Sequence, residues 1–389
     1  MTSPAQVWLA DHEADLVAVR RALHARPELG RAEYKTTALL CTRLQEAGLA
    51  PKVLATGTGL ACDVGSGAGP LVLLRADIDA LPLADEKHVP YRSQVPGVCH
   101  ACGHDVHSAV VLGAGLVLAG LDLPGRVRLI FQPAEELMPG GALDVITEGH
   151  LDGANAIFGL HCDPALEVGR VGLKSGPITA AADAIEVVLT GPGGHTSRPH
   201  NTVDLVHVLA TVATGVPAAL SRLVDPRAGM CVVWGHVSAG VARNAIPREG
   251  VLRGTLRVLD KTAWHSAPEL ITRIVDGLAA PYGARATVTY DRGVPPVVND
   301  PAATALLTAA SITALGAGAV LPTLQSLGGE DFGWYLDHVQ GAMARLGVRP
   351  PGLEHPFDLH QGAFDVDEAA IGVGVRVLVA AALAALETG

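Results

Sequence analysis

Short apolar runs alternate with helix-like periodic segments along the first part of the chain. The runs at 71–75, 126–131 and 156–160 are continuous and largely aliphatic, which is typical of buried strands. The segments at 6–48 and 108–121 carry apolar residues at helical spacing. Strands that alternate with helices predict an α/β fold, with a mostly parallel sheet flanked by helices.

The pattern changes after about residue 180. One strand, one helix and three further strands are predicted there, at 184–190, 203–221, 230–237, 250–259 and 286–290. A second helix is expected before the last strand. The resulting order of strands and helices predicts a small α+β unit whose sheet is covered on one side. We therefore expect a catalytic domain formed by residues 1–179 and 294–389, with residues 180–293 inserted as a second domain.

Composition excludes several classes of partner. The 389 residues are 49% hydrophobic and 17% charged, which predicts a well-buried globular protein. The net charge is −11 and no block of Lys or Arg occurs, so nucleic acid and anionic membranes are poor partners. The uncharged stretches at 301–329 and 377–386 are interrupted or too short to cross a bilayer. Six scattered cysteines and the lack of a targeting segment predict a reducing compartment, the cytoplasm.

Candidate metal ligands follow the predicted strands. Residues 98–107 hold two cysteines, three histidines and Asp105, while Glu135 and Glu136 follow one strand and His161 ends another. His360 lies near the C-terminus. Ligands collect at the carboxyl ends of strands in such sheets. The set predicts a hydrolase with two metal ions and a carboxylate that acts on a metal-bound water.

The cluster at 98–107 has two interpretations. Cys99 and Cys102 with His104 and His107 would form a structural zinc site, but one residue between the pairs is too few to wrap an ion. We favour a split arrangement, in which Cys102 and His104 lie on the same side of an extended segment. The Cys102 thiolate could bridge two ions, because anionic ligands offset their charge.

Other residues are candidates for supporting roles. Asp77 could hydrogen-bond a ligand imidazole or lie against an ion, and Asp79, Asp105 and the pair Glu330 and Asp331 are candidates for the same role. Glu136 would be an ion ligand and Glu135 the base. His355 is a rival of His360 as a ligand.

The inserted unit has polar candidates of its own. His195 follows a glycine-rich turn and would matter only if this unit closes over the metals. Asn244 and Arg257 could bind a substrate carboxylate, since the Arg guanidinium suits bidentate recognition.

The motifs occur in an order that resembles the amidohydrolase branch of the di-zinc aminoacylase and carboxypeptidase family. They lie at 21–30, 75–82, 100–105, 132–136, 159–161, 193–195, 244–247, 329–332 and 359–360. The resemblance implies a di-zinc exopeptidase-like catalytic domain with an inserted ferredoxin-like lid, through which the chain forms a homodimer. It implies metal ligands at Cys102, His104, Glu136, His161 and His360.

The resemblance also implies the chemistry. Glu135 would be the general base, Asp77 the residue that orients a ligand, and His195 a group that reaches the partner subunit's active site. Asn244 and Arg257 would hold the substrate carboxylate. The expected reaction is hydrolysis of the amide bond of an N-acyl amino acid, with two divalent ions: zinc or manganese, with cobalt or nickel as further options. A dipeptidase or carboxypeptidase, and a catalytically silent metal-binding protein, remain alternatives.

Overall fold

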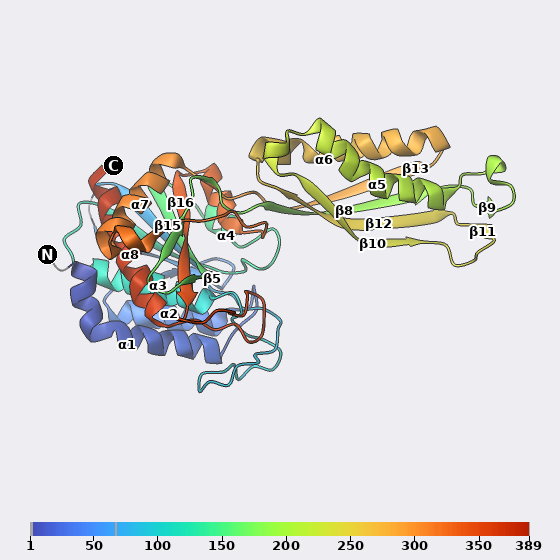
Figure 1. Ribbon diagram of the computed structural model, residues 1–389. Coiled ribbons are helices and arrows are strands. Elements are labelled where there is room, and N and C mark those ends of the chain that lie inside the picture. Colours follow the sequence, from blue (N-terminus) through green and yellow to red (C-terminus); the bar gives the residue numbers. More distant parts are fainter. Residues whose placement is uncertain (1–2, 67, 389) are drawn as a thin grey trace. The chain divides into compact units, whose positions relative to one another are not determined.

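The computed structural model describes residues 3–66 and 68–388 (Figure 1). The chain divides into two compact units. Unit 1 comprises Met1–Gly176, Asn299–Leu324 and Asp331–Gly389, and unit 2 comprises Pro177–Val298 and Gln325–Glu330. The assignment of residues 180–293 to a lid and dimerisation domain stays a prediction.

Unit 1 is built on an eight-stranded mixed sheet in the order β1-β2-β4-β3-β5-β16-β6-β15. The four central strands β4, β3, β5 and β16 are mutually parallel, which confirms the predicted sheet. Every residue of β3 is buried, as its apolar run at 71–74 predicts, and the burial includes the charged residues Arg75 and Asp77. The strands are β1 (Lys52–Val53), β2 (Leu60–Val64), β3 (Leu71–Asp77), β4 (Arg126–Gln132), β5 (Ala154–Glu167), β6 (Val171–Leu173), β15 (Val320–Pro322) and β16 (Gly341–Arg349).

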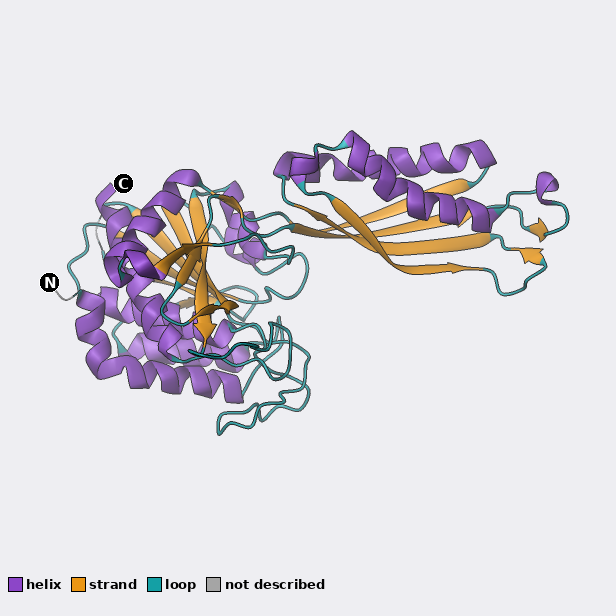
Figure 2. Ribbon diagram, viewed as in Figure 1, coloured by secondary structure: helices purple, strands orange, loops and turns teal. Residues whose placement is uncertain are grey.

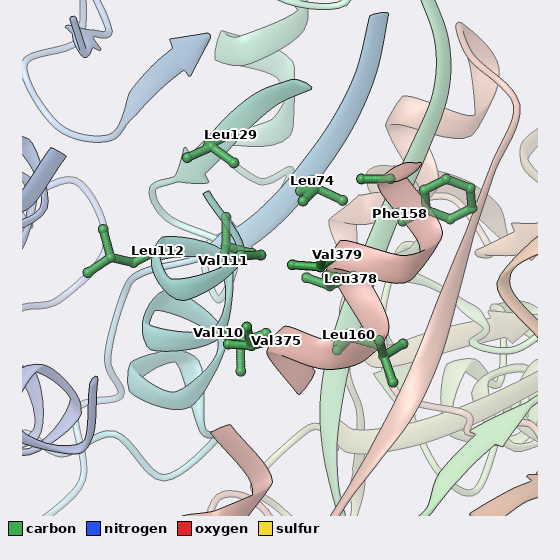
Figure 3. Packing of buried hydrophobic residues seen from close by; sticks show 14 of the residues in the cluster. Leu74, Val110, Val111, Leu112, Leu129, Phe158, Leu160, Val375, Leu378 and Val379 are labelled. Atoms are coloured by element: carbon green, nitrogen blue, oxygen red, sulfur yellow. The ribbon is translucent and has the colours of Figure 1, made fainter. Parts of the chain in front are cut away.

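Helices flank this sheet (Figure 2). They are α1 (Pro4–Ala25), α2 (Tyr34–Glu46), α3 (His104–Ala119), α4 (Ala142–Thr147), α7 (Pro301–Leu315) and α8 (Ala369–Thr388), with 3₁₀ turns η4 (Ala317–Ala319) and η5 (Asp331–Asp337). Figure 3 shows Val110 and Val111 of α3 with Val375 and Leu378 of α8 in the core, beside Leu74 of β3. This packing holds the first residue of α3 at the edge of the sheet.

Two helices, α8 and α5 (Leu205–Leu223), are long and apolar enough to cross a membrane by length and composition alone. In α8, 67% of the most apolar window is buried inside the fold, as expected for a core helix.

The helix predicted at 6–48 is wrong in its middle. The structure has two helices, α1 and α2, separated by residues 26–33. Pro27 disfavours helical dihedral angles at the preceding residue, and Arg26 accordingly has φ −133° and ψ 57°. Leu29 in the interruption forms a bridge with Ala80, so the break brings this segment against the end of β3.

The extended segment predicted for Cys102 and His104 is also wrong. Helix α3 begins at His104, four residues earlier than predicted, and Gly103 before it adopts a left-handed conformation with φ 87°. A Cβ at this position would lie 2.7 Å from Sγ of Cys162, so glycine is required for space as well as for conformation. A tight turn therefore separates the two side chains.

Unit 2 has a four-stranded antiparallel sheet in the order β10-β12-β8-β13, covered on one face by α5 and α6 (Figure 2). The chain order β8, α5, β10, β12, α6, β13 is ferredoxin-like, as predicted. The elements are β8 (Ala181–Thr190), β10 (Cys231–Ala239), β12 (Glu249–Val258), β13 (Arg285–Val294) and α6 (Lys261–Ala279), with short strands β7 (Gly176–Pro177), β9 (Gly194–His195), β11 (Ala245–Ile246) and β14 (Val298–Asn299) and turns η1 (Pro199–Asn201), η2 (Pro226–Ala228) and η3 (Ala280–Tyr282).

Candidate metal centre

The candidate ligands of unit 1 gather at the carboxyl edge of the parallel strands. β4 leads into Glu135 and Glu136, and His161 lies on β5. Cys102 and His104 come from the turn that starts α3. His360 lies in the loop after β16, where its backbone N–H donates to the carbonyl of Ala101 at 2.8 Å. That hydrogen bond fixes the C-terminal ligand beside the turn.

Two groups of ligand atoms form around one thiol. Donor atoms of Cys102, His104 and His161 lie within 4.8 Å of one another, and so do those of Cys102, Glu136 and His360. Sγ of Cys102 is 3.6 Å from Nε2 of His161, and Oε1 of Glu136 is 3.1 Å from Nε2 of His360. Because Cys102 belongs to both groups, the arrangement suits two ions that share a bridging thiolate.

Hydrogen bonds prepare two imidazoles for metal binding. Nδ1 of His104 donates to Asp79 at 3.2 Å, and Nδ1 of His161 donates to the carbonyl of Cys162 at 2.8 Å. In the neutral form of each ring, the proton on Nδ1 leaves a lone pair on Nε2. Such outer partners fix both the tautomer and the orientation of a ligand ring.

The electrostatics of the centre favour a cation. Burial alone would lower the pKa of His104, but the carboxylates of Asp77, Asp79 and Glu136 outweigh it and raise the pKa to about 10. Burial, reinforced by the neighbouring His107, keeps the pKa of His161 well below its usual value. The centre therefore attracts positive charge at one imidazole and keeps the other neutral.

The residues fit the metal ions that the sequence predicts. Nε2 of His104 is buried and makes no hydrogen bond among the residues described, and carboxylate oxygens of Asp77, Glu135 and Glu136 lie 3.7 to 4.0 Å from it. Leaving such an atom unpaired is costly, and a bound ion would satisfy it. Thiolate, imidazole and carboxylate together are the ligand set of zinc, and manganese, cobalt and nickel accept parts of it.

His107 is held in a way that excludes it from the ligand set. Its Nε2 accepts the backbone N–H of Cys162 at 2.9 Å, and its Nδ1 donates to Asp77 at 2.5 Å. Both nitrogens are thus used. Asp77 orients His107 and is also paired with Arg75 at 2.8 Å. His104, a candidate ligand, donates its hydrogen bond to Asp79 instead.

The structural zinc site does not assemble among the described residues. Cys99 joins none of the ligating groups, and neither does the exposed His355. The rival interpretations of the sequence therefore have no geometric support in unit 1.

Glu135 lies inside the centre without a position in either thiol-sharing group. Its side chain is 8% exposed, and its Oε2 is 4.0 Å from Nε2 of His104. The turn that carries it is fixed by backbone hydrogen bonds: Ala134 N–H donates to Glu33 at 2.7 Å, and Glu136 N–H donates to Asp79 at 3.0 Å. Glu33 was missed by the sequence reasoning, because no local motif marks a contact across 101 residues.

A buried ionic network lies behind the centre. Asp105, the second residue of α3, accepts from Arg20 at 2.7 Å and from Nδ1 of His24 at 2.8 Å. Arg20 also contacts Asp365 and Glu368, both at 3.2 Å. The network joins α1 to the start of α3 and to the segment after His360.

The candidates in unit 2 do not all converge. His195 on β9 pairs with Ala245, which follows Asn244, so these two candidates are neighbours at one end of the unit (Figure 1). Both are exposed, and Nδ1 of His195 accepts from the Ser197 hydroxyl at 2.8 Å. Arg257 lies eight residues along β12 from its first residue, which corresponds to roughly 26 Å of strand. Asn244 and Arg257 of one chain are therefore too far apart to bind one carboxylate together.

Comparison with known proteins identifies the family. The sequence profile of peptidase family M20/M25/M40 matches residues 73–384. N-acetyl-L-cysteine deacetylase of Bacillus subtilis is 38% identical over 368 residues, covering 94% of this chain and 86% of its own. The crystal structure of the YXEP protein of Bacillus subtilis, described as a dinuclear metal binding peptidase from the M20 family, superposes with TM-score 0.86 at 33% identity, covering 98% and 99% of the two chains. The chain belongs to the M20/M25/M40 peptidase family, in its amidohydrolase branch.

One relative is considerably longer. A Rhodococcus jostii protein named for a glutamate–cysteine ligase is 49% identical over 376 residues, which cover 96% of this chain. The chain spans 47% of that relative's length. The name describes a protein about twice as long, so it is not transferred to this chain.

Proposed function

We propose that the protein hydrolyses the amide bond of N-acyl amino acids, with Glu135 as the general base. The observation that carries the proposal is the buried carboxylate of Glu135, which lies beside the two ligand groups that share Cys102 and belongs to neither of them, although one of its oxygens also lies within 4.8 Å of ligand atoms of His104 and Glu136. A base near bound ions but not ligating them is the arrangement that hydrolytic metalloenzymes use.

The ligands proposed for two divalent ions are Cys102, His104, Glu136, His161 and His360. When bound, such ions supply Lewis acidity that polarises a carbonyl and makes water more acidic. The remaining steps belong to the chain. A carboxylate oxygen of Glu135 takes one proton from water as the water oxygen bonds to the amide carbon. Glu135 then delivers that proton to the amide nitrogen as the C–N bond breaks, giving a carboxylic acid and an amine.

Unit 2 supplies the remaining candidates. We propose that His195 stabilises the oxyanion and that Asn244 and Arg257 bind the substrate carboxylate. Because Asn244 and Arg257 are far apart within one subunit, we propose that the two come from different subunits of a homodimer. Cytoplasmic location stays part of the proposal, and sedimentation at several protein concentrations tests the dimer.

Relatives narrow the substrate class. The deacetylase of Bacillus subtilis acts, by its name, on N-acetyl-L-cysteine. We propose that this chain likewise accepts an amino acid with a small or apolar acyl group. The experiment is a metal-supplemented screen of N-acetyl amino acids, including N-acetyl-L-cysteine, with hippurate and dipeptides measured alongside.

Glu135→Gln is the decisive variant in that screen. It should keep its metal content and lose activity by about a hundredfold or more, as expected for loss of a general base. Glu46→Gln, on the exposed side of α2, is the matched control and should behave as wild type. Undiminished turnover by Glu135→Gln would remove the mechanism, and faster turnover of dipeptides than of acyl amino acids would favour a dipeptidase.

A further inference from the structure

Ala134, the residue before Glu135, has a backbone conformation that disfavours a side chain. Its φ is 53°, in the left-handed region, where a residue with a Cβ is strained relative to glycine. The only other described residues that share this property without being glycine are Arg31 and His360. A strained residue next to a proposed base persists only if surrounding contacts hold it.

The holding contacts are specific. Ala134 N–H donates to Oε1 of Glu33 at 2.7 Å, and the carbonyl of Ala134 accepts from Gly141 N–H at 3.1 Å. Two residues on, Glu136 N–H donates to Asp79 at 3.0 Å. Buried carboxylates therefore hold the amides on both sides of Glu135. A hydrogen bond to a charged acceptor is about twice as strong as a neutral one.

The backbone of Glu33 is held at the start of α2. It is the residue before α2, and its carbonyl accepts both the N–H and the hydroxyl of Thr37, at 2.9 and 2.7 Å. Its side chain is fully buried, and burial raises the pKa of its carboxyl. A buried carboxylate is costly to retain for stability alone. At 2.7 Å its carboxylate accepts a hydrogen bond from the amide of a strained residue beside the base.

We propose that Glu33 is a positioning residue for Glu135. By accepting the Ala134 N–H, it holds the left-handed turn that directs the Glu135 carboxylate into the centre. The inference rests on the proposed function. It assigns a role in amide hydrolysis to a residue that touches neither substrate nor metal ligand.

Three substitutions of Glu33 separate this role from general stability. Glu33→Gln keeps an oxygen acceptor at the same reach and should retain most of kcat. Glu33→Ala removes the acceptor and should lower kcat per metal-loaded molecule by about 10- to 100-fold, the range for second partners of catalytic groups, with little change in KM. Glu33→Asp keeps the charge but withdraws it by one methylene, so it should resemble Glu33→Ala and serves if the alanine variant does not fold.

The strain gives a second test. In the double variant Glu33→Ala with Ala134→Gly, residue 134 has no Cβ and adopts the left-handed conformation without strain. The turn should then form without Glu33, so kcat should recover by about three- to tenfold over Glu33→Ala alone. A residue needed only for stability gives no such recovery, because glycine adds flexibility to the unfolded chain and lowers stability further.

Hydrogen exchange at the Ala134 amide tests the role of Glu33 without an activity assay. The Ala134 amide should be protected in wild type and in Glu33→Gln, and should exchange at least tenfold faster in Glu33→Ala and Glu33→Asp. Unchanged protection, unchanged kcat in metal-loaded Glu33→Ala, or a Glu33→Gln variant as impaired as Glu33→Ala would each overturn the proposal. Absence of amide hydrolysis by the wild type, or full activity of Glu135→Gln, would instead refute the proposed function. The hydrogen-exchange rate of the Ala134 amide would still test whether Glu33 holds the turn.

Discussion

Asp79 accepts hydrogen bonds from two of the proposed ligand residues, and Asp79→Asn should therefore weaken metal binding. The side chain is 1% exposed, and it accepts from Nδ1 of His104 at 3.2 Å and from Glu136 N–H at 3.0 Å. Both partners are donors. An asparagine has one oxygen to offer them, so its NH₂ group must face the other donor.

The expected loss of metal affinity follows from the loss of one hydrogen bond to Asp79. A hydrogen bond to a charged group contributes about 1.5–3 kcal/mol. Because each 1.4 kcal/mol corresponds to a factor of ten in affinity, the loss of one bond weakens binding of an ion by about 10- to 100-fold. If the NH₂ group faces His104, that ring is also driven toward protonation at Nε2, which removes the lone pair needed by a metal.

The assay is competition with a chelator of known zinc affinity, together with the metal content of the purified protein. The control is Asp63→Asn, which changes a carboxylate paired with Arg128 on the distant part of the sheet. Equal affinities in wild type and Asp79→Asn, for both ions, would refute the assignment of Asp79 as the residue that orients the ligands. A comparable loss in the control would show that the effect is not local.

Three further outcomes are expected. His107→Asn should still bind two ions per chain, because both ring nitrogens of His107 are already used by Asp77 and by a backbone amide; loss of an ion on elemental analysis would contradict this. Arg20→Gln leaves Asp105 buried without its strongest partner and should lower the free energy of unfolding by about 3–5 kcal/mol in a denaturant titration; a change below about 1 kcal/mol would contradict it. Glu33→Gln should be more stable than wild type at pH 7. Burial raises the pKa of the Glu33 carboxyl in the folded state, so the wild type loses stability as pH rises through that value, and the difference should vanish below about pH 4. A difference independent of pH would contradict the sign.

The fold could be predicted from the sequence where apolar pattern and strand ends determine it. The unbroken run at 71–75 and the strand order after residue 180 each specify one arrangement, and both are confirmed. The helix at 6–48 was wrong because Pro27 interrupts a pattern whose apolar spacing continues on both sides. The spacing of apolar residues predicts which face of a helix is buried, but it does not predict where the backbone turns.

The site was less predictable in its supporting residues. The apolar runs end just before candidate ligands such as His161, which predicts that a parallel sheet brings them together, although β5 continues past His161 to Glu167. The contact of Glu33 with Ala134 depends on the packing of α2 against the turn after β4, which no spacing in the sequence encodes. The same holds for the hydrogen bond of His104, which goes to Asp79 and not to Asp77. Asp77 is the last residue of β3 and Asp79 lies two residues beyond it, so the spacing in the sequence does not distinguish the two carboxylates.

The most direct test of the account is anomalous diffraction from crystals grown with zinc or manganese. Two peaks are predicted in each chain, both at about 2.3 Å from Sγ of Cys102, with His104 and His161 completing one set and Glu136 and His360 the other. Glu135 should lie outside bonding distance of either ion. A single peak, or an ion bonded to Glu135 in place of Glu136, would contradict the assignment of the base and with it the proposed reaction.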